Sequence, residues 1–232
     1  MLDECVVTAA SQNHAKSMFS LLQHIGKFNI FMYDLGLSDD NLQRLKAVHP
    51  RVVVHRFPFH DYPKFFEVFG EYAWKPAIIE TMLRQCKAVL WLDAGDRVNS
   101  RLLPSIFAKI HRGGFISSQT SGTVKTWVHP ETRRALATRK FVVSDHKPMC
   151  NGAIVGIDQY HHTRPMQRIV LPWLQCALNQ SCIAPPGSSR GNHRQDQAVL
   201  TVIAHSVGFG SACYTGYHGI RIHQDDDWKR GL

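Results

Sequence analysis

The residues best suited to chemistry in this sequence are two carboxylates, Asp93 and Asp96, in the stretch KAVLWLDAGDRV at residues 87–98. They directly follow an apolar run, and only Ala94 and Gly95 separate them. Two carboxylates at one loop suit a hard divalent cation such as Mg²⁺ or Mn²⁺. Such a cation can hold a diphosphate and neutralise the charge that builds on its leaving group. An ordinary turn is the alternative interpretation, because Asp and Gly are common turn residues.

Two acids alone would make a weak metal site, so further oxygen or nitrogen ligands are expected from elsewhere in the chain. His223 and His218, near the C-terminus, are candidates for this role. The chain has 14 histidines, and most of them are expected to be ordinary surface or core residues.

A basic loop, SSRGNHR at residues 188–194, leads into a predicted helix. It places Arg190, His193 and Arg194 beside the free backbone N–H groups of a helix N-terminus, where anions bind well. Asp196 follows in the first turn, where a carboxylate can accept a proton from a reacting hydroxyl. The alternatives are an ordinary surface loop and an acid that only complements the helix dipole.

The elements that must position these residues alternate between strand and helix. The patterns predict strands at residues 4–10, 28–34, 51–57 and 88–93, and helices at 11–26, 37–48 and 75–86. Ser38 is expected to cap the second helix, and Pro76 to occupy the first helical position of the third. This order predicts an α/β fold with a mostly parallel sheet flanked by helices and a Rossmann-like N-terminal half. Such sheets bind ligands at the carboxyl ends of their strands, where Asp93 stands.

The second half gives weaker patterns. Helices are expected at 102–114, 129–138, about 164–178 and 192–208, the last capped by Asn192. Strands are expected at 115–118, 150–158 and 219–224, and loops at 119–127 and 184–193.

Composition excludes several classes. The 232 residues carry a net charge of +9, so an anionic partner is plausible, but the basic residues are scattered and no nucleic-acid-binding motif occurs. No apolar run is long enough to span a membrane. Six cysteines form no C-x-x-C pair, which argues against a structural zinc site. Cys176 and Cys182 bracket a short loop and are candidates for a disulfide, which the sequence leaves open.

That loop contains the sequon Asn179-Gln180-Ser181, which points towards a secretory lumen. We expect the secretory pathway, in particular the Golgi lumen, if the source is eukaryotic, and the cytoplasm otherwise. The N-terminal MLDECVVTAA lacks signal-peptide features, and the chain is compatible with a catalytic fragment from which an anchor or further domains were removed.

Five segments together resemble the GT-A-fold glycosyltransferases, in the family-8-like branch of the nucleotide-diphospho-sugar transferases. The acidic turn after the fourth strand is similar to their D-x-D metal motif. The other segments that match in order are YAWKPAIIETML, NGAIVGI, RQDQAVLTVIA and GYHGIRIH. The resemblance covers about residues 4–224. It implies a single GT-A-like domain over residues 1–232, with a nucleotide-binding half at about 3–100 and a donor-sugar and acceptor half at about 101–224.

The resemblance also implies roles for single residues. Asp93, Asp96 and His223 would hold the metal, and Asp196 and Asn151 would be catalytic. The donor would be bound by a larger set, comprising Thr8, Ala9 and Asp34 for the base and ribose, Lys75 and Asp93 near the phosphates, Gly152 beside the sugar, and Arg190, His193 and Arg194 at the diphosphate or an acidic sugar. One departure stands out, because Gly95 occupies the third position of D-x-D.

The expected function is transfer of a hexose or pentose from a nucleotide-diphosphate sugar to a hydroxyl of a glycan, protein or small molecule, with Mn²⁺ or Mg²⁺. This is a reaction of glycan biosynthesis. One alternative is a non-catalytic sugar-nucleotide-binding protein on the same scaffold. Another is a metal-dependent phosphatase of the haloacid-dehalogenase type. The donor base and sugar, the acceptor, retention or inversion at the anomeric carbon, and the oligomeric state stay open.

Overall fold

Two β-sheets organise the computed structural model, which describes residues 1–26 and 28–225. The larger sheet has the strand order β3-β2-β1-β4-β8-β5. Its parallel part comprises β1 (Leu2–Ala10), β2 (Ile30–Asp34), β3 (Val52–Arg56) and β4 (Cys86–Leu92). Strand β8 (Ile154–Asp158) runs antiparallel to β4, and β5 (Phe115–Ile116) antiparallel to β8. The expected mostly parallel α/β sheet is confirmed.

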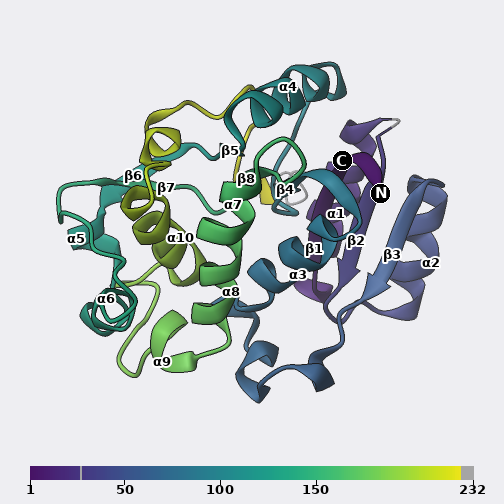
Figure 1. The fold of residues 1–232 in the computed structure, drawn as a ribbon. Coiled ribbons are helices and arrows are strands. Elements are labelled where there is room, and N and C mark those ends of the chain that lie inside the picture. Colours follow the sequence, from purple (N-terminus) through teal and green to yellow (C-terminus); the bar gives the residue numbers. More distant parts are fainter. Residues whose placement is uncertain (27, 226–232) are drawn as a thin grey trace.

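Helices cover both faces of this sheet because its central strands are apolar on both sides. On one face pack α1 (Ala15–Ile25), α2 (Asp39–Val48) and α4 (Leu103–Gly113). On the other pack α3 (Trp74–Leu83), α10 (Gln195–Ser206) and a helical stretch made of α7 (Thr163–Pro165), a π-helical segment (Met166–Val170) and α8 (Leu171–Ala177). Figure 1 shows the second half of the chain gathered beside the end of the sheet away from β3.

Local signals explain several helix boundaries. The Ser38 hydroxyl accepts a hydrogen bond from the Asn41 backbone N–H at 3.3 Å, which is the expected cap of α2. Helix α4 ends at Gly113 and is capped by Gly114, whose positive φ of 74° suits glycine. Helix α3 begins at Trp74, so Pro76 is its third residue and not the first helical position as expected, but it still lies within the first turn, where no intrahelical donor is lost.

Three expectations for the second half were wrong. Residues 119–127, expected as a loop, form β6 (Gln119–Thr123) and α5 (Val124–Trp127), and β6 pairs with β7 (Pro148–Cys150). Helix α10 begins at Gln195 with Arg194 as its N-cap, because the Asn192 side chain accepts instead from the Ser189 N–H. Residues 219–224 form no strand, only a single bridge between Arg97 and Arg221. The short helices α6 (Pro130–Ala137) and α9 (Gln180–Ile183) complete this half.

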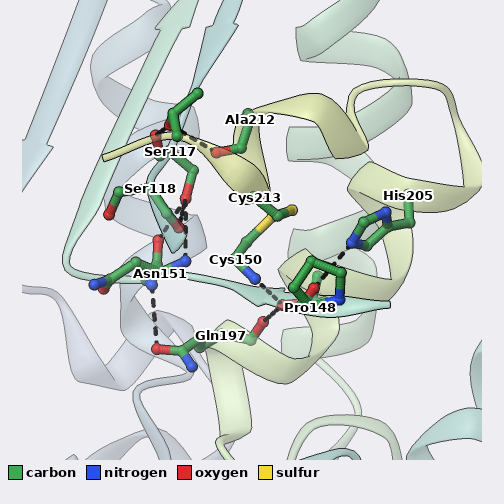
Figure 2. The surroundings of a disulfide bond; sticks show 12 residues. Ser117, Ser118, Pro148, Cys150, Asn151, Gln197, His205, Ala212 and Cys213 are labelled. Atoms are coloured by element: carbon green, nitrogen blue, oxygen red, sulfur yellow. Dashed lines mark hydrogen bonds between the residues drawn. A yellow bond between two sulfur atoms is a disulfide. The ribbon is translucent and has the colours of Figure 1, made fainter. Parts of the chain in front are cut away.

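All six cysteines form disulfides. Cys5–Cys86 joins the neighbouring strands β1 and β4, and Cys176–Cys182 closes the loop that the sequence singled out. Cys150–Cys213 ties β7 to a 3₁₀ turn at Gly210–Tyr214 (Figure 2). Among the described helices, none has the length and apolar character that crossing a membrane requires.

Candidate active site

A cavity of about 680 Å³ opens at the carboxyl ends of β1 and β4. These are the strands at which the order of the sheet reverses, since β2 and β3 lie to one side of β1 and the later strands to the other. In an open α/β sheet the two loops at such a point diverge and leave a crevice, which is where ligands bind. Ala9 and Ala10 line it from β1, and the acidic turn after β4 lines it from the other side.

A buried lysine stands at the centre of this cavity wall. The Lys75 side chain is only 2% exposed, and its Nζ lies 2.9 Å from Asp93 Oδ1 and 3.0 Å from Asp196 Oδ2. It also donates to the Gly152 carbonyl at 3.0 Å. Trp91 Nε1 donates to the same Asp93 oxygen at 2.7 Å, so the orientation of this carboxylate is fixed twice. Lys75 therefore joins α3, the end of β4 and the start of α10 at one point.

The charges of this group compensate each other. Burial opposes the charged form of Lys75, but the carboxylates of Asp196 and Asp93 outweigh it and raise the pKa of the ammonium. Burial raises the pKa of Asp196, with a contribution from the negative charge of Asp93, while Lys75 acts in the opposite sense. Asp196 is thus a more basic carboxylate than an ordinary aspartate, and it is held in place by a cation.

Asp96 lacks a direct ion pair of this kind, and the charge of Lys75 offsets its burial only in part. Its side chain is fully buried on the cavity wall, and neither of its carboxylate oxygens has a hydrogen-bond partner among the described residues. Burial, and then the neighbouring charge of Asp93, raise its pKa well above the usual value. An unsatisfied buried carboxylate is costly to the fold, so such a group indicates a ligand that the site is built to receive.

The C-terminal segment brings further ligands to this corner. Backbone hydrogen bonds between Arg97 and Arg221, at 2.8 and 2.9 Å, and from Gln224 N–H to the Gly95 carbonyl, at 2.7 Å, fasten it to the acidic turn. His223 and Asp225 consequently line the same cavity.

Asp225 fits the chain's departure from D-x-D. Its carboxylate lies directly over Gly95, where any side chain at position 95 would overlap it. One Asp225 oxygen, Oδ1, is buried without a hydrogen-bond partner among the described residues. The sequence interpretation missed Asp225, although its position two residues after the candidate ligand His223 was a usable signal.

The residue types at this corner suit a hard divalent cation. Asp93, Asp96 and Asp225 bring carboxylates and His223 an imidazole to the lining of one cavity, although no three of their ligand atoms lie within 4.8 Å of one another in the described structure. Oxygen-rich sets of this kind suit Mn²⁺ or Mg²⁺, and a cation would satisfy the orphaned oxygens of Asp96 and Asp225.

The segment between β7 and β8 forms a close wall of the cavity. The Asn151 N–H donates to the Ser118 carbonyl at 2.8 Å, and its side-chain oxygen accepts from the Ala153 N–H at 2.8 Å. Its Nδ2 is buried without a described partner, so a donor is left for a ligand. Gly152 lies so near α10 that an added Cβ would be 2.9 Å from Asp196 Oδ2. Figure 2 shows Asn151 between Ser117 and Gln197, beside the Cys150–Cys213 disulfide.

Two arginines form the basic side of the cavity, and both rest on aromatic rings. The Arg190 guanidinium donates to the Tyr72 hydroxyl at 2.7 Å and lies 5.7 Å from the centre of that ring. The Arg194 guanidinium lies 4.0 Å from the centre of the Trp127 ring. Among the described residues no carboxylate pairs with either arginine, so their charges remain available to an anion.

The structure brings most of the sequence-predicted residues to this one cavity. Those that line it are Ala9, Lys75, Asp93, Asp96, Asn151, Gly152, Arg190, Arg194, Asp196 and His223. Thr8, Asp34 and His193 do not line it. Thr8 is fully buried within β1, and Asp34 accepts from the backbone N–H groups of Gly36 and Leu37, so it stabilises its own turn.

His193 and His218 serve the local structure instead. His193 is fully buried, its Nε2 bonds to the Ile183 carbonyl at 2.8 Å, and burial lowers its pKa to about 4. A neutral buried imidazole cannot act as a cation for a diphosphate. His218 is turned to the Ser117 carbonyl at 2.8 Å and does not line the cavity.

A second group with metal-ligating atoms lies at the opposite edge of the sheet. His111, Asp158 and His161 place one ligand atom each within 4.8 Å of one another, near the amino ends of β1 and β4. The ring Nδ1 atoms of His111 and His161 lie 2.6 and 2.7 Å from one oxygen of Asp158. The other oxygen accepts from the backbone N–H groups of Tyr160 and His161. Hydrogen bonds therefore already satisfy this carboxylate.

Comparison with known proteins bears on the fold. A family model described as a protein of unknown function (DUF1647) matches residues 2–80. No curated protein sequence matches the chain.

Several solved structures share its architecture. The galactosyltransferase LgtC, in complex with donor and acceptor sugar analogues, has a TM-score of 0.55 and 15% identity over 86% of this chain and 70% of that one. The bifunctional glycosyltransferase WbbM in its apo form has a TM-score of 0.56 and 14% identity, covering 87% of this chain and 37% of that one. Mouse xyloside xylosyltransferase 1 in its apo form has a TM-score of 0.51 and 12% identity over 88% and 81%. The chain therefore has the GT-A fold of these glycosyltransferases, as expected.

Proposed function

We propose that this protein is a metal-dependent glycosyltransferase that uses a nucleotide-diphosphate sugar as donor. The observation that carries the proposal is Asp96, a fully buried carboxylate without a partner, on the wall of a cavity at the switch point of a GT-A fold. A cation at this corner would answer its unsatisfied charge. A diphosphate bound to that cation would lie inside the same cavity.

In this proposal, different parts of the cavity would bind the metal, the nucleotide and a further negative charge. Asp93, Asp96, Asp225 and His223 would hold Mn²⁺ or Mg²⁺, which supplies positive charge to the diphosphate when bound. The β1 end at Ala9 would contact the nucleotide. Arg190 and Arg194 would bind a further negative charge of the donor or acceptor, since no described carboxylate neutralises them.

The wall around Lys75 would act on the sugar. Gly152 allows close approach of the sugar ring, and the free Asn151 Nδ2 offers it a hydrogen bond. Asp196, whose pKa burial raises, would take the proton of the acceptor hydroxyl. The acceptor oxygen then bonds to the anomeric carbon, and the bond from that carbon to the diphosphate oxygen breaks with its electron pair. The nucleoside diphosphate is the leaving group.

Lys75 has a positioning role in this scheme. It touches both Asp93 on the metal side and Asp196 on the sugar side, so it fixes the spacing between diphosphate and reacting carbon. Orientation of reacting groups by fixed charges contributes strongly to rate when the groups are held within a fraction of an ångström.

The experiment is a thermal-shift panel of UDP- and GDP-linked sugars with and without Mn²⁺, followed by a turnover assay on the sugars that bind. We expect a Mn²⁺-dependent rise in the unfolding midpoint with at least one donor, and release of its nucleoside diphosphate to an acceptor or to water. Asp196→Asn should retain binding and lose turnover, while Asp93→Asn should lose the Mn²⁺-dependent shift. Absence of any shift with every donor would contradict the proposal.

A non-catalytic sugar-nucleotide binder is the second candidate, and one observation favours it. Lys75 neutralises Asp196, the carboxylate to which we assign the proton. Binding of a donor at saturating Mn²⁺ without turnover on any acceptor or water would support this alternative over the transferase.

A further inference from the structure

The short loop closed by Cys176 and Cys182 lies outside the proposed active site. No residue from 176 to 183 lines the cavity. The loop contains Asn179, Gln180 and Ser181. Of the seven asparagines in the chain, Asn179 is the one that begins an N-x-Ser/Thr sequence.

Both residues that an oligosaccharyltransferase must recognise are exposed. Asn179 and Ser181 lie at the surface, at the start of the short helix α9. The Asn179 side-chain oxygen accepts from the Ser181 N–H at 3.1 Å. Asn179 is exposed, and within residues 1–26 and 28–225 its amide nitrogen has no hydrogen-bond partner. A glycan attached to this nitrogen would displace no contact of the described fold.

The disulfides give independent information about where the chain matures. Cys5–Cys86 and Cys150–Cys213 close segments of 81 and 63 residues, and no cysteine is left free. The cysteines are fully buried, so these bonds form as part of folding. Disulfides of this kind persist in oxidising compartments and are rare in the reducing cytosol. The lumen where such bonds form is also where N-linked glycans are added.

We propose that the protein matures in the lumen of a secretory compartment and carries an N-linked oligosaccharide on Asn179. The donor is an oligosaccharide on a lipid-linked diphosphate. The Asn179 amide nitrogen bonds to the anomeric carbon of that oligosaccharide and loses one proton. The bond from the same carbon to the lipid diphosphate breaks, and its electron pair leaves with the diphosphate. The chain would thus be an acceptor of a glycan, whatever the activity of its own cavity.

To test this, the full chain is expressed behind a cleavable secretion signal in eukaryotic cells. The intact mass of the secreted protein is then measured before and after treatment with peptide N-glycosidase. We expect loss of one oligosaccharide mass from the wild-type protein, with conversion of Asn179 to aspartate located by peptide mapping. Asn179→Gln and Ser181→Ala should each abolish the modification. Ser181→Thr should retain it, because threonine also satisfies the sequon. Asn192→Gln, at an exposed asparagine outside any sequon, is the matched control and should leave it unchanged.

Thiol counting under non-reducing conditions tests the oxidising environment separately. Six cysteines in three bonds are expected, and reduction should lower the midpoint of thermal unfolding. Secreted, folded protein that stays unmodified at Asn179 would overturn the glycan, as long as a resident glycoprotein of the same cells is modified. Six free thiols in active protein would overturn the lumenal maturation. Neither result bears on donor binding, so the failure of this inference is separate from that of the proposed function.

Discussion

A fully buried aspartate lies near each end of the central strand β4, Asp158 at the amino end and Asp96 beyond the carboxyl end. The two differ in the hydrogen bonds that their carboxylates accept. At the amino end of β4, Asp158 accepts hydrogen bonds on both oxygens, from two imidazoles and two backbone N–H groups. At the carboxyl end, Asp96 is equally buried and accepts none among the described residues. One carboxylate is part of a finished hydrogen-bond network, and the other lacks a partner.

Whether a buried carboxylate has hydrogen-bond partners distinguishes a structural cluster from a binding site better than the types of residue around it do. His111, Asp158 and His161 are good metal ligands by chemistry, yet their contacts already compensate each other. Asp96 stands beside the negative charge of Asp93, and Asp225 contributes to its raised pKa as well. Folding tolerates such an arrangement where a ligand completes it.

The largest effect on stability is expected from Lys75→Met. The substitution leaves the carboxylates of Asp93 and Asp196 without their shared cation, and removing one partner of a buried ion pair costs about 3–5 kcal/mol. Because Asp93 is 31% exposed, we expect the lower end of that range. Urea unfolding of the variant measures it.

Lys64→Met is the matched control, since its pairing with Glu67 lies at the surface. It should change the free energy of unfolding by less than about 1 kcal/mol. A loss for Lys75→Met no greater than that of the control would contradict the role of Lys75 as the centre of the site.

The next prediction compares Asp158→Asn with Asp96→Asn, two isosteric changes at the opposite edges. Asp158→Asn should lower the free energy of unfolding by about 2–3 kcal/mol, because it removes charge-assisted hydrogen bonds to His111 and His161. Asp96→Asn should not lower it without metal, because the buried carboxyl group that it replaces has no hydrogen-bond partner among the described residues. Chemical denaturation in the presence of a chelator measures both free energies of unfolding. Equal losses in the two variants would contradict the proposed difference between Asp96 and Asp158.

The sequence predicted the first half of the fold well and the second half less completely, for physical reasons. Strands such as β4 are unbroken apolar runs, and helices such as α1 carry one apolar face, so local pattern suffices. Strand β6, QTSGT, has no apolar alternation and is a strand only because β7 pairs with it. The start of α10 depends likewise on a distant contact, since the Arg194 N–H donates to the Trp127 carbonyl.

For the site, the sequence predicted that the functional residues lie at the ends of strands and helices, and the fold brings most of them to one cavity. It could not show that Asp34 is consumed by its own turn or that His193 is fully buried, because both depend on tertiary packing. It also missed Asp225, which reaches the acidic corner through the pairing of Arg97 with Arg221 and the hydrogen bond from Gln224 to Gly95.

A smaller, pH-dependent effect on stability is expected from His111, which lies near the amino end of β4 beside Asp158. Burial opposes the charge on His111, but its hydrogen bonds to Asp158 and Glu4 outweigh this and raise its pKa. A raised histidine pKa stabilises the fold fully below the unfolded value of 6.5, and this contribution is lost as the pH rises through the folded pKa. Thermal unfolding of wild type and His111→Gln should therefore differ most at about pH 5.5 and less at about pH 8.5. A difference that grows with pH would show that the network does not favour protonated His111.

The smallest effect on stability, with a clear effect on binding, is expected from Gly95→Ala. The added methyl group would overlap the Asp225 carboxylate, which can turn away at little cost because it is the end of a flexible side chain. The free energy of unfolding should change by less than about 1 kcal/mol, while the affinity for Mn²⁺ with a nucleoside diphosphate falls. Titration of Mn²⁺ in the presence of UDP or GDP tests this. Unchanged affinity would remove Asp225 from the metal site.

The most direct test of the account is calorimetric titration of UDP and GDP into the protein with and without Mn²⁺, for wild type, Asp96→Asn and Asp158→Asn. We predict Mn²⁺-dependent binding of at least one nucleotide to wild type and Asp158→Asn, and loss of that dependence in Asp96→Asn. Mn²⁺-dependent binding that survives in Asp96→Asn at wild-type strength would contradict the claim that the partnerless carboxylate of the acidic corner holds the cation.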